Sequence, residues 1–317
     1  AGVGNIKGDG IKLDSSSNAA ISGNKVIDTA STGFDIGSGI FIINSDDVTV
    51  GGEALADGNS LTNIAWDGIK FSGGNGAIIQ NNTIDGVTRA GIYLGGVNTA
   101  SVLSNTLSNV ATNAVGAIES DFGSNLSITS NTVRSSNANG IAVHNAGGSN
   151  LIDQNTLNNT TIAIEATGDN NLTVSNNTIG RFSDTGILVN SATGVTSVSG
   201  NSINNKVDVY SGPTLLYSYY DYTGTGIHLL NTNGAQLTNN NVYGTNRAIW
   251  NDGSNTTTIS GGTLYDNTTG IRINPSTGVT VDGVVIGGDG TTAGIQVVDS
   301  NNTTLKNNTL YDLGGKA

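Results

Sequence analysis

Hydrophobic and polar residues alternate in short segments that return in the same order along almost the whole chain. A Gly-Ile or Ala-Ile pair places its isoleucine at positions 11, 40, 69, 92, 118, 141, 164, 187, 227, 249, 271 and 295. An Asn-x-aliphatic segment keeps step with this pair, as at Asn82–Ile84 and Asn105–Leu107, and a third alternating segment precedes that asparagine. Alternating segments of three to five residues, separated by Gly, Asn, Ser and Asp, are typical of short strands joined by turns.

This repeat predicts an all-β fold in which each copy is one coil of a solenoid. Coils of about 22 to 23 residues, stacked on their copies, give every short strand a parallel neighbour on both sides. We therefore expect a single-stranded right-handed parallel β-helix of about twelve coils, with three short strands in each coil. The recurring asparagine is expected to form a ladder at one turn, where each side-chain amide donates to one neighbour and accepts from the other.

The repeat fills residues 1–317, and the sequence indicates one domain with two larger insertions. One is a Tyr-rich insertion at about 206–225, and the other is an acidic loop at about 44–60. Neither end carries a recognisable cap, although a bare solenoid end is an unpaired strand edge that favours aggregation. We therefore expect flanking domains and a longer parent chain.

The pattern "NNTIDG…GIYL" resembles the parallel β-helix repeats of the pectin-lyase-like superfamily, and the resemblance extends from "GDGIKL" to "NNTLYDL". It implies the β-helix fold but not one activity, because the superfamily includes polysaccharide lyases, hydrolases and epimerases as well as tailspikes and surface adhesins. The polygalacturonase pattern is incomplete, since Asp67 in "WDGIK" is followed by no paired Asp, Gly-His-Gly or Arg-Ile-Lys. Asp67 is therefore interpreted as a turn residue. The alginate epimerase pattern is also incomplete, since Gly33-Phe34-Asp35 lacks the Pro and His that would follow.

Charge and composition exclude several classes of partner. The net charge is −12, and the 12 Lys and Arg residues are scattered singly, which disfavours a nucleic-acid groove or an anionic membrane surface. No apolar run approaches the roughly 18 residues that a membrane helix needs, so we expect no membrane insertion. The absence of Cys excludes disulfides and a thiol nucleophile. Low charge with an acidic balance favours an extracellular or cell-surface protein.

The residue after each Gly-Ile pair should point outward, because side chains alternate along a strand. This outward column collects long aromatic and charged side chains, whereas other outward positions are mostly Ser, Thr, Asn and Asp. Aromatic faces and charges on a rigid sheet suit a polysaccharide or cell-surface glycan. The candidate binding residues are Lys70, Tyr93, His228, Trp250 and Arg272, with Tyr217, Tyr219 and Tyr220 from the insertion. The insertion is equally compatible with a small hairpin packed on the solenoid, and we expect it to overhang Trp250 and Arg272.

Four acidic and imidazole side chains form a second candidate site. Glu119 and Glu165 occupy the same outward position two coils apart, with small Ala142 between them and with Asp121 and His144 beside the gap. Two carboxylates with room for a water are the arrangement of an inverting glycosidase, in which one is the general acid and the other the general base. Acidic groups of this kind, or the acidic loop, can instead hold Ca²⁺. No cofactor is required by the sequence.

Three functions therefore remain open. The first is an adhesin-like module that binds carbohydrate or another surface along its outward face. The second is a polysaccharide lyase, glycoside hydrolase or epimerase that acts over Glu119 and Glu165. The third is a passive structural stalk whose outward column has no ligand.

Overall fold

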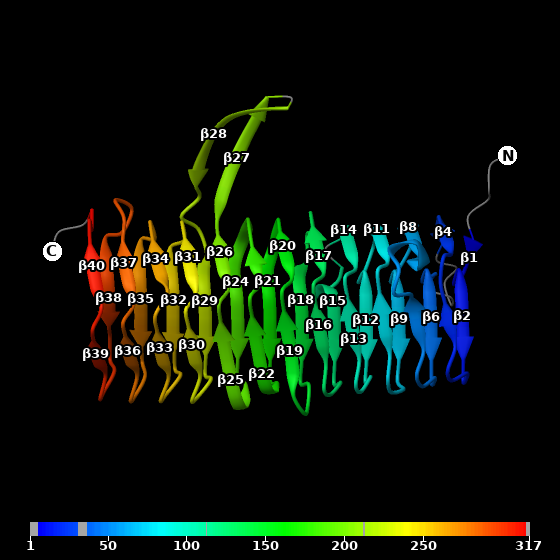
Figure 1. Ribbon diagram of the computed structural model, residues 1–317, viewed down its shortest axis with the longest axis horizontal. Helices are drawn as coiled ribbons and strands as arrows, with labels where there is room; N and C mark the ends of the chain where they lie inside the picture. The colour runs from blue at the N-terminus through cyan, green and yellow to red at the C-terminus, as the bar shows by residue number, and fades with distance from the viewer. Residues whose placement is uncertain (1–5, 31–36, 112, 212, 315–317) are drawn as a thin grey trace. The chain divides into compact units, whose positions relative to one another are not determined.

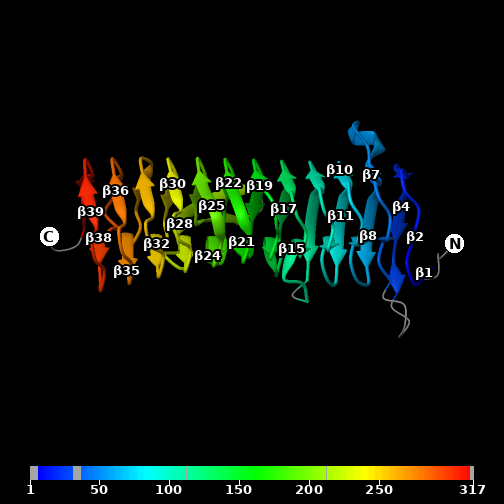
Figure 2. The same ribbon diagram turned by 90° about the horizontal axis from the view of Figure 1, so that it is seen from below.

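A computed structural model describes residues 6–30, 37–111, 113–211 and 213–314. The chain forms two compact units, 1–160 and 161–317. In both units each coil contributes one strand to each of three parallel sheets, which confirms the predicted parallel β-helix. We name the sheets the Gly-Ile sheet, the intermediate sheet and the Asn sheet, after the segments that form them. The described residues also include a short 3₁₀ helix, η1 (Leu55–Asp57), which stands beside β7 in Figure 2.

In the first unit the strands are as follows. The Gly-Ile sheet contains β2 (Ile11–Asp14), β6 (Ile40–Ile43), β9 (Ile69–Ser72), β12 (Ile92–Gly95), β15 (Gly116–Asp121) and β18 (Asn139–His144). The intermediate sheet contains β3 (Ala20–Ile21), β7 (Thr49–Gly51), β10 (Ile78–Gln80), β13 (Ser101–Leu103), β16 (Ser127–Thr129) and β19 (Asn150–Asp153). The Asn sheet contains β4 (Lys25–Ile27), β8 (Ser60–Ile64), β11 (Thr83–Val87), β14 (Thr106–Val110), β17 (Thr132–Arg134) and β20 (Thr156–Asn158). A separate pair joins β1 (Ile6–Lys7) to β5 (Thr29–Ala30).

The second unit repeats this arrangement. Its Gly-Ile sheet contains β21 (Thr160–Thr167), β24 (Phe182–Asn190), β29 (Thr225–Leu230), β32 (Arg247–Asp252), β35 (Thr269–Asn274) and β38 (Ala293–Val297). Its intermediate sheet contains β22 (Asn170–Ser175), β25 (Thr193–Ser199), β30 (Gln236–Thr238), β33 (Thr258–Ser260), β36 (Thr280–Asp282) and β39 (Thr304–Lys306). Its Asn sheet contains β23 (Thr178–Ile179), β26 (Ser202–Asn204), β31 (Asn241–Tyr243), β34 (Thr263–Tyr265), β37 (Val285–Gly287) and β40 (Thr309–Tyr311).

The core consists of equivalent aliphatic residues stacked coil on coil. In the first unit Ile69, Ile92 and Ile118 pair in register and are fully buried. In the second unit the equivalent isoleucines of β29, β32 and β35 pair in the same way and are at most 2% exposed. In most coils a glycine precedes this isoleucine, because the next coil comes close to that position, and in the others a small alanine takes its place. A Cβ at Gly68 would lie 2.5 Å from the carbonyl oxygen of Gly91, and this close approach explains why the Gly-Ile pair recurs.

The predicted asparagine ladder is confirmed. In the first unit the Nδ2 atoms of Asn59, Asn82 and Asn105 donate to the Oδ1 atoms of the next asparagines at 2.9 to 3.0 Å. Each Oδ1 also accepts the backbone N–H of the preceding ladder residue, as Asn105 does from Asn82 at 2.9 Å. In the second unit Asn177, Asn201 and Asn240 continue the same pattern. The left-handed backbone lies at the residue before the ladder asparagine, for example Asn81 with φ of 57°.

Candidate functional site

The outward column exists in both units, and its members are in register. In the first unit Phe41, Lys70, Tyr93, Glu119 and Ala142 occupy one line across the Gly-Ile sheet. In the second unit the line contains Leu188, His228, Trp250, Arg272 and Gln296. Most of these side chains are half-buried, so that part of each remains accessible. Two members are not accessible as an outward position predicts: Glu119 is only 4% exposed, and Ala142 is fully buried.

Glu119 is covered because an arginine that the repeat pattern does not indicate reaches across to it. The Nη1 atom of Arg89 donates to both carboxylate oxygens of Asp67, at 2.7 and 2.8 Å, and its Nη2 atom donates to Oε1 of Glu119 at 3.2 Å. The backbone N–H of Ala90 also donates to Asp67 at 3.1 Å. The guanidinium of Arg89 therefore bridges Asp67 of the preceding coil and Glu119 of the following coil.

Asp67 does lie at the turn before β9, but the turn interpretation is incomplete, because its carboxylate is fully buried and ion-paired. Burial raises the pKa of Asp67, and the neighbouring charge of Arg89 opposes that rise. Burial likewise raises the pKa of Glu119, again opposed by Arg89 and reinforced by the negative charge of Asp121. The Oε2 atom of Glu119 is shielded from water and has no hydrogen-bond partner among the described residues.

Aromatic rings surround the arginine. The guanidinium carbon of Arg89 lies 4.1 Å from the ring centre of Tyr93 and 6.0 Å from that of Trp66. Burial raises the pKa of the Tyr93 phenol, and the charge of Asp121 raises it further. The ring of Tyr93 lies against Gly95, where an added Cβ would be 3.0 Å from the ring. The glycine thus leaves space for the tyrosine on the outward face.

Asp121 and His144, which the sequence places beside the gap, lie next to each other in adjacent strands. They pair in register in β15 and β18, and Nδ1 of His144 lies 3.1 Å from Oδ1 of Asp121. Glu119 lies two residues from Asp121 on the same outward face of β15. Glu165 lies in β21 of the second unit and is half-buried. Its pairing with Glu119 across a water-sized gap stays a prediction.

In the second unit the column contains a stacked pair of rings. The rings of His228 and Trp250 are parallel within 1°, with centres 4.2 Å apart. The guanidinium of Arg247 lies over Trp250, 4.6 Å from its ring centre. Nε2 of His228 lies 3.7 Å from Oδ2 of Asp252. Burial lowers the pKa of His228, and the charges of Asp252 and Asp184 oppose that effect.

The Tyr-rich insertion is an antiparallel ribbon of β27 (Lys206–Ser211) and β28 (Thr214–Tyr220). At its base Tyr220 packs so closely on Gly244 that an added Cβ there would lie 2.1 Å from the ring. Tyr217 and Tyr219 in β28 lie between this base and the turn at the other end of the ribbon, and they are 57% and 47% exposed. The ribbon therefore combines a packed base with exposed tyrosines along β28, and Figure 1 shows it pointing away from β29, β32 and β35 rather than overhanging them.

The acidic loop has four exposed carboxylates, at Asp46, Asp47, Glu53 and Asp57. Asp46 accepts hydrogen bonds from the backbone and side chain of Asn75, at 2.8 and 3.2 Å. Among the residues that the structure describes, no three Asp, Glu or His side chains are grouped to hold a metal ion. The segment Gly33-Phe34-Asp35 lies outside the described residues.

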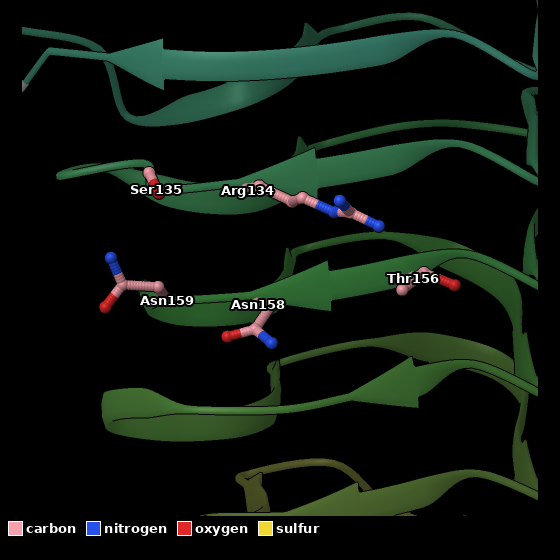
Figure 3. A pocket seen from close by; sticks show the side chains of 5 residues that line it. All are labelled: Arg134, Ser135, Thr156, Asn158 and Asn159. Atoms are coloured by element: carbon pink, nitrogen blue, oxygen red, sulfur yellow. The ribbon is translucent and has the colours of Figure 1, made fainter. Parts of the chain in front are cut away.

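A pocket lies on the first-unit Asn sheet (Figure 3). Its volume is about 340 Å³, and it is lined by Arg134, Ser135, Thr156, Asn158 and Asn159. All five side chains belong to β17, β20 or the turns after them, and none is a predicted site residue.

The solved structures that are similar to this chain include a surface adhesin and an alginate epimerase. The surface adhesin PfbA of Streptococcus pneumoniae is 11% identical, with 90% of this chain and 86% of that chain covered and a TM-score of 0.51. A mutant of the periplasmic alginate epimerase AlgG is 12% identical, with 95% and 76% covered and a TM-score of 0.50. At these identities the likeness shows the fold alone. No curated protein matches the sequence. Within the described residues, no helix has the length and apolar character that crossing a membrane requires.

A family model described as the periplasmic copper-binding protein NosD matches residues 208–315. The donors that copper prefers are His, Cys and Met side chains. The whole chain contains neither Cys nor Met, and residues 208–315 contain the single histidine His228. The residues present in this segment therefore do not fit a copper site.

A second family model, described as the right handed beta helix region, matches residues 3–157 and 67–223. Together these matches extend over 3–223, and the parallel sheets and asparagine ladder agree with that description. The chain belongs to the family of right-handed β-helix proteins.

Proposed function

We propose that this protein is an extracellular or cell-surface module that binds glycans in the manner of an adhesin, through the outward faces of its Gly-Ile sheets. The observation that carries the proposal is the ordering of aromatic and cationic side chains on these faces. Lys70 lies 4.9 Å from the ring centre of Phe41, Arg89 lies 4.1 Å from that of Tyr93, and the rings of His228 and Trp250 stack. Side chains held in place before binding lose less conformational entropy when a ligand arrives.

The acidic groups favour binding over hydrolysis. A hydrolase needs carboxylates that are free to exchange protons with substrate and water. Asp67 and Glu119 are instead bonded to Arg89, and Asp121 lies against His144. The similarity to a surface adhesin in fold agrees with this function without establishing it. The exposed Tyr217 and Tyr219 would add a second contact surface, since tyrosines give contact area at low entropic cost.

The test is a panel of immobilised polysaccharides containing alginate, pectate, xylan, chondroitin and host-type glycans, with and without Ca²⁺. Both retention of the protein and release of new chain ends would be recorded. We expect retention without new ends, and we expect Tyr93→Ala and Trp250→Ala to weaken it several-fold. Ile78→Ala is the matched control, because Ile78 is 40% exposed on the intermediate sheet. Equal retention of all three variants would contradict the proposal.

A polysaccharide-modifying enzyme is the second candidate, and one observation favours it. The Oε2 atom of Glu119 is buried without a partner among the described residues, its pKa is raised by burial, and Asp121 and His144 lie beside it. A carboxyl group whose pKa is raised by burial is suited to act as a general acid. In this case Glu165 would act as the base, and release of new ends would be abolished by Glu119→Gln and by Glu165→Gln. A folded protein with neither retention nor release would support the structural stalk.

A further inference from the structure

Two arginines on the second-unit Gly-Ile sheet lie close enough to repel each other, and among the described residues neither forms a salt bridge. Arg247 begins β32, and Arg272 in β35 is the register partner of Trp250. Adjacent parallel strands are about 4.8 Å apart, so Arg272 and Trp250 are direct neighbours. Among the described residues, neither guanidinium has a carboxylate oxygen within 4.0 Å. We name Arg247, Trp250 and Arg272 the arginine cluster.

The two charges repel each other. Burial lowers the pKa of Arg247, and the charge of Arg272 lowers it further, while Asp252 partly compensates. The chain has 24 Asp and Glu residues against 12 Lys and Arg, so acidic residues outnumber basic ones by two to one. Asp252, whose charge partly compensates at Arg247, also lies 3.7 Å from Nε2 of His228. Adjacent cations left unpaired in such an acidic protein are suited to a negatively charged ligand.

Hydrogen-bond donors in the cluster also lack acceptors. The Nε1 atom of Trp250 and the Nε atom of Arg272 are shielded from water and have no hydrogen-bond partner among the described residues. A shielded donor without an acceptor is unfavourable. The indole cannot swing aside easily, because its ring is stacked on His228.

We propose that the arginine cluster binds the anionic group of an acidic sugar, either a carboxylate or a sulfate ester. Both groups present several oxygens to the planar fork of a guanidinium, and arginine binds such groups with paired hydrogen bonds. The inference rests on the proposed function, since the acidic sugar is one residue of the bound glycan. It adds the chemical class of that sugar and a binding residue, Arg247, that the repeat pattern does not indicate.

The experiment measures binding of the whole chain to four soluble polymers by isothermal titration. Alginate and pectate offer carboxylates, dextran sulfate offers sulfate esters, and dextran offers only hydroxyls. The variants are Arg247→Gln and Arg272→Gln, and the control is Arg134→Gln, an exposed arginine on the first-unit Asn sheet. We expect each cluster variant to lose about tenfold or more in affinity, as for hydrogen bonds between charged groups, and the control to lose less than about twofold.

The arms of this experiment separate the outcomes. Binding to alginate or pectate alone identifies the carboxylate, and binding to dextran sulfate alone identifies the sulfate ester. Unchanged affinity of both cluster variants overturns the inference. Binding only to dextran or another neutral glycan overturns it while leaving the proposed function intact, whereas no binding to any glycan rejects both. If circular dichroism shows that a Gln variant does not fold, Arg272→Lys takes its place. Lysine keeps the positive charge but lacks the planar guanidinium. Undiminished affinity of Arg272→Lys would overturn the inference.

Discussion

Arg89 and Asp67 form a two-oxygen ion pair between consecutive coils, with the carboxylate fully buried and the arginine side chain 18% exposed. The same guanidinium also holds Glu119 of the following coil. Removing the cation would leave two shielded carboxylates unpaired. Loss of one partner of a buried pair typically costs about 3–5 kcal/mol.

We therefore expect Arg89→Ala to lower the free energy of unfolding by about 3 kcal/mol or more. Urea unfolding, followed by circular dichroism, measures this change. The control is Arg134→Ala, which should stay within about 0.5 kcal/mol because Arg134 is exposed. A loss in Arg89→Ala no larger than in the control would show that the pair contributes little.

The raised pKa of Glu119 predicts an unusual pH dependence. The pKa of Glu119 is 4.5 in the unfolded chain and higher in the folded protein. Between these two pKa values the folded protein holds a proton that the unfolded chain has lost. The free energy of unfolding therefore falls as the pH rises from 4.5 toward the folded pKa. We expect the urea midpoint of the unmodified protein, relative to that of Glu119→Gln, to fall as the pH is raised from 4.5. A difference that grows with pH would mean that the ion pair with Arg89 outweighs burial.

His228 should titrate below its usual range. Burial lowers its pKa from 6.5, so its imidazole is expected to remain neutral at a pH where a free histidine is half protonated. Because the unfolded state then binds more protons, this group stabilises the protein above pH 6.5, and its contribution is lost on acidification. Proton NMR of the two histidines, assigned with His144→Gln, measures the midpoint. A midpoint at or above 6.5 would contradict the burial argument.

The asparagine ladder should be sensitive to single substitutions. Asn105 accepts from the backbone N–H of Asn82 and donates to the carbonyl of Ile79 at 2.8 Å, so Asn105→Ala leaves buried groups unpaired. We expect a loss of about 2 kcal/mol or more in the free energy of unfolding. The matched substitution Asn158→Ala removes an exposed asparagine and should have little effect. Similar losses in both variants would rule out a special role for the ladder.

The Tyr-rich ribbon is expected to be the first site of proteolysis. Two paired strands without further support are marginally stable in water, and Tyr217 and Tyr219 are exposed. Brief digestion with chymotrypsin should therefore cut after these tyrosines before it cuts after other aromatic residues, and mass spectrometry identifies the fragments. Phe122 provides an internal comparison, because it is 70% exposed at a turn of the first unit. First cleavage at Phe122 would indicate that the ribbon is protected in solution.

The coils, the three sheets, the buried isoleucines and the asparagine ladder were all predictable from the amino-acid pattern. These features follow from local alternation and from one repeat, since each coil meets only its neighbours and equivalent residues must stack. The outward column and the pairing of Asp121 with His144 were predictable for the same reason, because register carries a position from one coil to the next.

The contacts that long side chains make outside their own column, in contrast, could be learned only from the tertiary structure. Arg89 precedes β12 outside the outward positions, yet its reach neutralises Asp67 and covers Glu119. Arg247 likewise lies three residues before Trp250 and reaches its ring by the conformation of its side chain. The repeat fixes where each backbone position lies, but it does not fix the direction of a flexible side chain with several rotatable bonds. That direction depends on charge, burial and neighbouring rings, which the fold brings together.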